Sequence, residues 1–182
     1  MPLSARRRAL ILAGGVVTAT AAAGALWVRA GNGGASLTVD AALQKIDALA
    51  DAITRGRIAS SGVWNPHQVF THCAQSIEYS MSGYPAAKSK LFQDTIGAAA
   101  FSVFAAKGKM THGLAEQIDG APALEAMPDA AAALARLRQA FLAFRDHGGL
   151  LAPHFAYGPL SREQYEMAHV MHFYNHLDEI RA

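Results

Sequence analysis

The sequence HVMHFYNH, at residues 169–176, does most to decide the fold and the chemistry expected of this chain. His172 and His176 are four residues apart, and His169 lies one turn earlier. In a helix, side chains at positions i and i+4 lie on one face, with Cβ atoms roughly 6 Å apart. Two imidazoles at this spacing can bind one metal ion, with Zn–N bonds of about 2.1 Å. The stretch therefore predicts a helix that carries part of a metal site.

Apolar residues with helical spacing recur through the rest of the chain. They predict helices over residues 36–54, 65–81, 86–106 and 128–148, and a last helix from 162 to near the end of the sequence. Asn65-Pro66 and the Ser161–Gln164 pair are residue types that start helices. Residues 109–126 have no helical pattern, and strand-like alternation does not occur. We expect an all-α fold, a four-helix bundle with an additional helix, preceded by an N-terminal signal or anchor helix.

Composition and charge fit one domain behind an N-terminal extension. The chain has 182 residues, of which 52% are hydrophobic. Four of its 16 basic residues lie in residues 1–30, which contain no acidic residue, so 12 basic and 14 acidic side chains remain beyond it. Because phosphate binding needs a basic surface, we expect no nucleic-acid partner. The expected divisions are a signal or anchor at 1–30, a flexible Gly-rich linker at 31–36 and the helical domain at 37–182.

The extension has the parts of an export signal. Arg6 to Arg8 precede an uncharged stretch over residues 9–28, and Ala19-Thr20-Ala21 has the small-residue pattern of a cleavage site. It resembles a twin-arginine (Tat) signal. An uncleaved anchor is the alternative, since twenty helical residues rise about 30 Å. In both cases the domain is exported, being periplasmic or held at the cytoplasmic membrane facing outward, with membrane contact only through this segment.

The third candidate ligand is His72, in VFTHCAQSIEYS, about a hundred residues before the histidine pair. Polar residues on the same helical face as a ligand could orient it, and the candidates for this role are Gln75, Ser76, Tyr165, His169 and Glu179. His154 lies in a proline-containing loop that could cover the mouth of the site. The remaining histidines with no ligand pattern are His67, His112 and His147.

Cys73 follows His72 directly and is the only cysteine of the chain. Successive helical residues point about 100° apart, so we expect Cys73 to be a buried packing thiol rather than a nucleophile. A single cysteine also excludes an intramolecular disulfide, and the absence of CxxCH excludes covalently attached c-type haem.

The arrangement of these histidines resembles that of the DinB/YfiT-like superfamily of metal-dependent four-helix bundles. Its members carry one histidine on the second helix, matched here by His72, and HxxxH on the last helix, matched by His172 and His176. The stretches NPHQVFTHCAQSIEYSMSGYP, IDGAPALEAM and PHFAYGPLSREQYEMAHVMHFYNHL further resemble an uncharacterised branch of that superfamily. The likeness extends from Val39 to the end, and departs at Asn175, where many members have another histidine.

Three neutral imidazoles leave coordination positions open, which is typical of a catalytic site. The ligand types suit Zn, Ni, Fe or Mn. The resemblance implies a hydrolase or a thiol S-transferase acting on a small-molecule substrate; it identifies no catalytic residue. Because no Glu lies within HxxxH, a non-enzymatic metal- or ligand-binding envelope protein is the alternative. Haem of the b type, with Met171 as a ligand, is a weaker hypothesis, since methionines at helical spacing are usually core residues. A homodimer is left open.

Overall fold

The computed structural model describes residues 36–182, and the predicted signal or anchor and most of the predicted linker lie outside this range. The described part is mostly helical, which confirms the all-α expectation. Its helices are α2 (Val39–Thr54), α3 (Pro66–Ser82), α4 (Lys90–Phe92), the π-helix η1 (Gln93–Gly97), α5 (Ala98–Lys107), α6 (Ala130–Asp146) and α7 (Arg162–Leu177). None of the helices in this part is both long and apolar enough to cross a bilayer.

Capping boxes start the two helices that carry the candidate ligands. At α3, the Asn65 side chain accepts a hydrogen bond from the Gln68 N–H, and the Gln68 side chain accepts one from the Asn65 N–H. At α7, Ser161 and Gln164 make the same reciprocal pair. Each box satisfies two N–H groups that the helix itself cannot pair. Both predicted starts are confirmed to within one residue, so local sequence sets the register of His72 and of the histidine pair.

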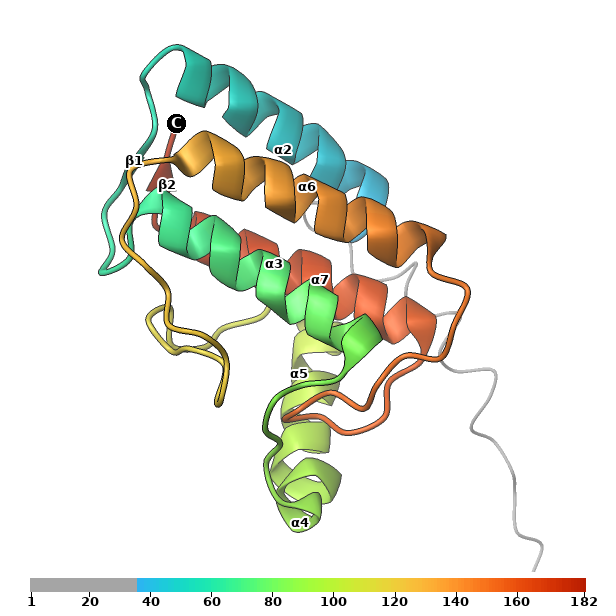
Figure 1. Cartoon of the computed structure of the whole chain (residues 1–182). Helices are drawn as coiled ribbons and strands as arrows, with labels where there is room; N and C mark the ends of the chain where they lie inside the picture. Colours follow the sequence, from blue (N-terminus) through green and yellow to red (C-terminus); the bar gives the residue numbers. More distant parts are fainter. Residues whose placement is uncertain (1–35) are drawn as a thin grey trace, which may run out of the picture. The chain divides into compact units, whose positions relative to one another are not determined.

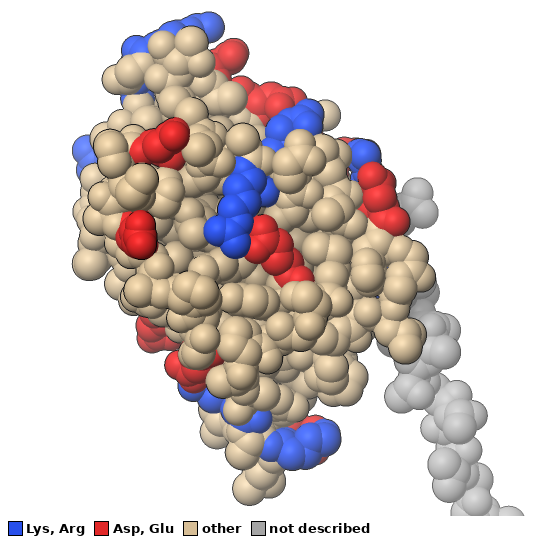
Figure 2. Space-filling view, viewed as in Figure 1, with Lys and Arg blue, Asp and Glu red and all other residues tan. Residues whose placement is uncertain are grey.

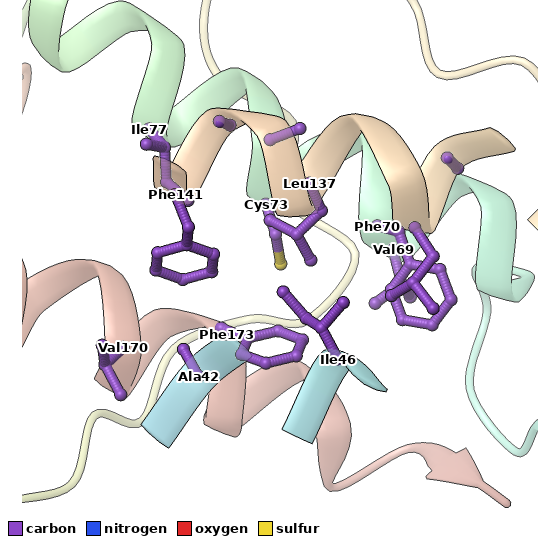
Figure 3. Packing of buried hydrophobic residues seen from close by; sticks show 14 of the residues in the cluster. Ala42, Ile46, Val69, Phe70, Cys73, Ile77, Leu137, Phe141, Val170 and Phe173 are labelled. Atoms are coloured by element: carbon purple, nitrogen blue, oxygen red, sulfur yellow. The ribbon is translucent and has the colours of Figure 1, made fainter. Parts of the chain in front are cut away.

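Four helices surround one core: α2 and α3 each contact both α6 and α7 (Figure 1). Ile46, Cys73, Leu137 and Phe173 come from these four helices in turn, and their side chains meet in the core (Figure 3). Cys73 is 1% exposed, and burial raises the pKa of its thiol far above the usual range. Its sulfur is a packing group, as the sequence predicted.

The third predicted helix, over residues 86–106, differs from the observed one. Helical structure begins at Lys90 and passes through the π-helix η1 before α5 starts. At the end of η1, a Cβ added to Gly97 would lie 1.9 Å from the carbonyl oxygen of Ala156. The loop after α6 therefore packs directly against the backbone of η1. An inserted π-turn of this kind often occurs beside a functional site.

A small antiparallel sheet joins two distant parts of the chain. Strand β1 (Ala59–Ser60) pairs with β2 (Ile180–Arg181), with Ala59 opposite Arg181. Two residues are too few to show a period-2 pattern, so the sequence carries no signal for these strands. The sheet holds the segment after α7 against the connection between α2 and α3.

Acidic and basic side chains lie interspersed on the face shown in Figure 2, among uncharged residues. Several form ion pairs between helices: Arg136 of α6 contacts Glu78 of α3 at 2.6 Å, and Arg138 contacts Asp47 of α2 at 3.4 Å. Such exposed pairs contribute little to stability individually. The absence of a nucleic-acid partner stays a prediction.

Candidate metal centre

The structure brings His72 of α3 together with His172 and His176 of α7. The Nε2 atom of His172 lies 3.1 Å from the Nε2 atom of His72 and 3.1 Å from that of His176. Two ligands of a tetrahedral zinc ion are about 3.4 Å apart when each bond is about 2.1 Å. The observed separations are therefore close to those of three ligands around one small cation.

Burial keeps the three rings neutral. It lowers the pKa of His72 to about 3, helped by repulsion from His112, and lowers that of His176 to about 2. The pKa of His172 falls well below its ordinary value for the same reason. A neutral imidazole has one nitrogen with a lone pair, and metal binding requires that form. When each ring carries its proton on Nδ1, the three Nε2 lone pairs face one another, and a cation among them relieves their repulsion. The residues therefore fit a divalent metal ion.

Trp64 closes one side of this cluster, and sequence reasoning did not single it out. Its ring stacks on His176, with centroids 5.8 Å apart and planes 12° apart, and lies 4.9 Å from the ring of His72. Trp64 is buried just before the capping box of α3. An apolar wall beside the ligands limits solvent access and lowers the local dielectric.

His112 is a fourth histidine beside the cluster, and it belongs to no ligand pattern in the sequence. Its ring centroid is 5.0 Å from that of His172 and 5.1 Å from that of His176. Its Nδ1 contacts the Gly113 carbonyl oxygen at 2.9 Å. A carbonyl oxygen only accepts, so Nδ1 is the protonated nitrogen and Nε2 carries the lone pair. That Nε2 is buried and has no hydrogen-bond partner in the part of the chain that the structure describes.

A cavity of about 730 Å³ adjoins the cluster. His72, His172 and His112 lie on its wall, as do His154 and His169. This volume falls in the range of small-molecule sites. Two of the three candidate ligands, His72 and His172, thus face a space that a substrate could occupy, which is the setting expected of an open metal site.

Two of the five residues predicted to orient the ligands form hydrogen bonds to the core around the cavity. His169 Nε2 lies 3.1 Å from the Ser80 hydroxyl oxygen, which itself donates to the Ile77 carbonyl at 2.6 Å. The hydroxyl oxygen is therefore the acceptor for His169. The Tyr165 hydroxyl donates to the Ala152 carbonyl at 2.7 Å.

The other three candidates are Gln75, Ser76 and Glu179. Gln75 is buried, and Ser76 lines the cavity, with its carbonyl accepting from the Tyr84 hydroxyl at 3.0 Å. Glu179 lies beyond the end of α7, with its carboxylate beside Gly62. Between residues 36 and 182, none of the five candidates hydrogen-bonds to a ligand histidine. Their orienting role stays a prediction.

Met171 packs in a second apolar cluster with Phe101, Met110 and Ala168. It is 1% exposed. This is the core position that helical spacing favours for methionine, and it gives no support to the haem hypothesis.

A family model described as "Protein of unknown function (DUF1569)" matches residues 33–182. The chain belongs to this family. The DUF1569 match covers every helix that the structure describes, all three clustered histidines, and His112 and His154. No curated protein and no solved structure matches the chain significantly. Kinship with the DinB-like superfamily stays a prediction.

Proposed function

We propose that this DUF1569 protein is a metal-dependent enzyme that binds one divalent cation through His72, His172 and His176. One observation carries the proposal: three neutral imidazoles converge, and two of them lie on the wall of a cavity large enough for a substrate. Zinc, nickel, iron and manganese all suit this ligand set. The likeness to DinB-like bundles, whose members place three histidines on corresponding helices, supports the same interpretation.

The proposed reaction is hydrolysis of a small molecule. A bound cation supplies Lewis acidity and lowers the pKa of a water or thiol that it contacts. The chain adds His112, whose lone pair on Nε2 lies buried beside the ligands without a partner among the described residues. Attack by water requires a group that accepts its proton, and a positioned histidine commonly does this. We assign that role to His112.

Thiol S-transfer is the other reaction that the DinB likeness implies. We rank it lower because residues 1–30 resemble an export signal, and we propose that the domain is exported. Low-molecular-weight thiols are kept mainly in the cytosol. An exported enzyme would therefore lack the co-substrate, whereas water is present everywhere.

Metal content tests the proposal directly. The purified chain should contain about one equivalent of a divalent metal, and His72→Ala should lose most of it, because two histidines remain where a zinc-type site needs at least three protein ligands. His67→Ala is the matched control: His67 lies on the same helix and bonds the Glu125 carbonyl oxygen through Nδ1 at 3.1 Å. Equal metal content in His72→Ala and wild type would end the proposal.

Turnover then separates an enzyme from a binding protein. Metal-loaded wild type should hydrolyse activated esters, and His112→Ala should retain its metal while the rate falls roughly 100-fold or more. Stoichiometric metal with no turnover of esters or thiol adducts would favour the non-enzymatic binding protein.

A further inference from the structure

The loop after α6 fixes the tautomer of a histidine that the proposed reaction has not used. His154 and Gly158 pair through two backbone hydrogen bonds of 2.8 and 3.0 Å, and Gly158 closes the turn with φ of 74°. Inside the turn, the N–H groups of Ala156 and Tyr157 both donate to His154 Nδ1, at 3.1 and 3.2 Å. A nitrogen that accepts two hydrogen bonds carries no proton, so the proton of the neutral ring is on Nε2.

That Nε2–H has no hydrogen-bond partner among the described residues. His154 lines the cavity wall and is 7% exposed. Its Nε2 makes no hydrogen bond within residues 36–182, and it is not among the fully buried atoms that lack a partner. The small exposed part of this side chain therefore includes the Nε2–H donor, on a residue that lines the space where a substrate would lie.

The turn that presents this donor is held on several sides. The Phe155 carbonyl accepts hydrogen bonds from the Lys88 N–H at 2.9 Å and from the Gln93 side chain at 3.2 Å. The His154 ring stacks on Tyr157, with centroids 4.2 Å apart and planes 6° apart. Gly97 of η1 leaves room for the Ala156 carbonyl. A donor anchored in this way is preorganised, which is what makes such groups effective toward a substrate oxygen.

The ring is also held in its uncharged form. Burial, with a smaller contribution from His169, lowers the pKa of His154 to about 3. Protonation would need Nδ1, which the two backbone N–H groups already occupy. His154 therefore acts as a neutral hydrogen-bond donor rather than as a cation. Such a group can polarise a carbonyl, but it cannot form an ion pair with a carboxylate.

The charged side chains on the rest of the cavity wall give a negatively charged substrate no unpaired cation among the described residues. Its lining includes one lysine, Lys88, which is paired with Asp119 at 2.7 Å, and a further acidic residue, Glu116. This part of the wall thus offers no cation without a carboxylate partner. Apolar side chains fill much of the remaining lining, among them Phe92, Met110, Ile118, Phe155 and Tyr157.

We infer that His154 Nε2–H binds the carbonyl oxygen of an uncharged acyl compound whose apolar or aromatic body packs in this cavity. The inference rests on the proposed function and deepens it by naming the substrate class: an ester or amide with no free acid group. His154 lines the same cavity as His72 and His172 of the cluster, so one carbonyl group could contact both the donor and the cluster.

Infrared spectroscopy of a bound ketone tests the donor without turnover. The probe is acetophenone labelled with ¹³C at its carbonyl, added to the full chain. A hydrogen bond from His154 lowers the carbonyl stretching frequency, and His154→Phe should bring it back up while metal content stays unchanged. His154→Gln, which keeps an N–H donor, should retain part of the shift. No bound signal, or the same frequency in wild type and His154→Phe, would overturn the inference.

The same measurement on His72→Ala separates this inference from the proposed function. If His154 is the donor, the lowered frequency persists in that variant, even where metal and activity are lost. A shift that disappears in His72→Ala and survives in His154→Phe would place the carbonyl on the metal and refute the donor role. Activity gives a further readout: loss of one such donor typically costs 10²–10³ in rate.

Wild-type protein alone also tests the tautomer, should His154→Phe fail to fold. In ¹⁵N spectra of histidine-labelled chain, His154 should be protonated at Nε2 at neutral pH, and its Nε2 signal should move when acetophenone is added. Protonation at Nδ1, or an unchanged Nε2 signal at saturating probe, would contradict the inference.

Discussion

Acid should destabilise the domain through His169, which is 2% exposed on α7. Its Nε2–H donates to the Ser80 hydroxyl oxygen, and its ring packs edge-on against Phe144 at 5.0 Å and near Tyr165 at 5.2 Å. No carboxylate forms an ion pair with it within residues 36–182. Burial without a compensating charge lowers the pKa of His169 to about 3.

The size of the effect follows from that shift. The unfolded chain binds a proton at His169 below a pKa of about 6.5, whereas the folded chain excludes it until about pH 3. Between these values the unfolded state holds more protons, so the free energy of unfolding falls as pH falls. Each pH unit costs about 1.4 kcal/mol, or about 2.7 kcal/mol from pH 6.5 to pH 4.5. Above about pH 6.5 the His169 ring is neutral in both the folded and the unfolded state, so this loss of stability is absent.

Urea unfolding followed by circular dichroism measures this pH dependence. A chelator is present so that pH-dependent metal binding does not add to the measured free energy of unfolding. The comparison is between wild type and His169→Gln, which keeps an N–H for Ser80 and cannot be protonated. The stability difference between them should change by about 1.4 kcal/mol per pH unit below pH 6.5. Ile46→Val, a buried change without a proton, should lower stability by about 1 kcal/mol at every pH. A wild-type minus His169→Gln difference that stays flat down to pH 4.5 would refute the reasoning.

Two other predictions concern the loop and the extension. Gly97→Ala places a Cβ 1.9 Å from the Ala156 carbonyl oxygen, so it should lower the free energy of unfolding by roughly 1–3 kcal/mol and weaken acetophenone binding. Gly148→Ala is the control, because a Cβ there has nothing within 4 Å, and it should change neither quantity. Calorimetry measures both. Replacing Arg7 and Arg8 by Lys should leave the precursor in the cytoplasm if the Tat route is used, and fractionation showing unchanged export would favour the general secretory route.

Most of the helical framework could be predicted because its signals are local. The start of α7 depends on a capping box four residues long, and apolar spacing within the helix fixes which face meets the core. The i,i+4 spacing of His172 and His176 alone put the two rings on one face. His72 could be added only through the family resemblance and its place on a second helix, because packing of α3 against α7 joins residues a hundred positions apart.

The parts that could not be predicted lie where the sequence has no helical or strand periodicity. His112 belongs to an irregular segment whose path is set by long-range packing, so its sequence neighbours carry no sign of the cluster it approaches. The π-turn in η1 depends on contact with the loop at Ala156, and β1 and β2 are too short for alternation. Trp64 precedes a predicted helix, but nothing local shows that it covers His176.

The division between helices and loops also explains how one cavity can hold several histidines with different tasks. Helices α3 and α7 supply the three that converge, since regular geometry fixes their spacing. His112 and His154 lie on loops, where each ring nitrogen meets a different backbone group: a carbonyl takes the Nδ1 proton of His112, and two N–H groups occupy Nδ1 of His154. One ring therefore offers an acceptor at Nε2 and the other a donor. The backbone groups beside each ring set which of its nitrogens is protonated. Exchanging the two roles would therefore require different loop conformations rather than different side chains.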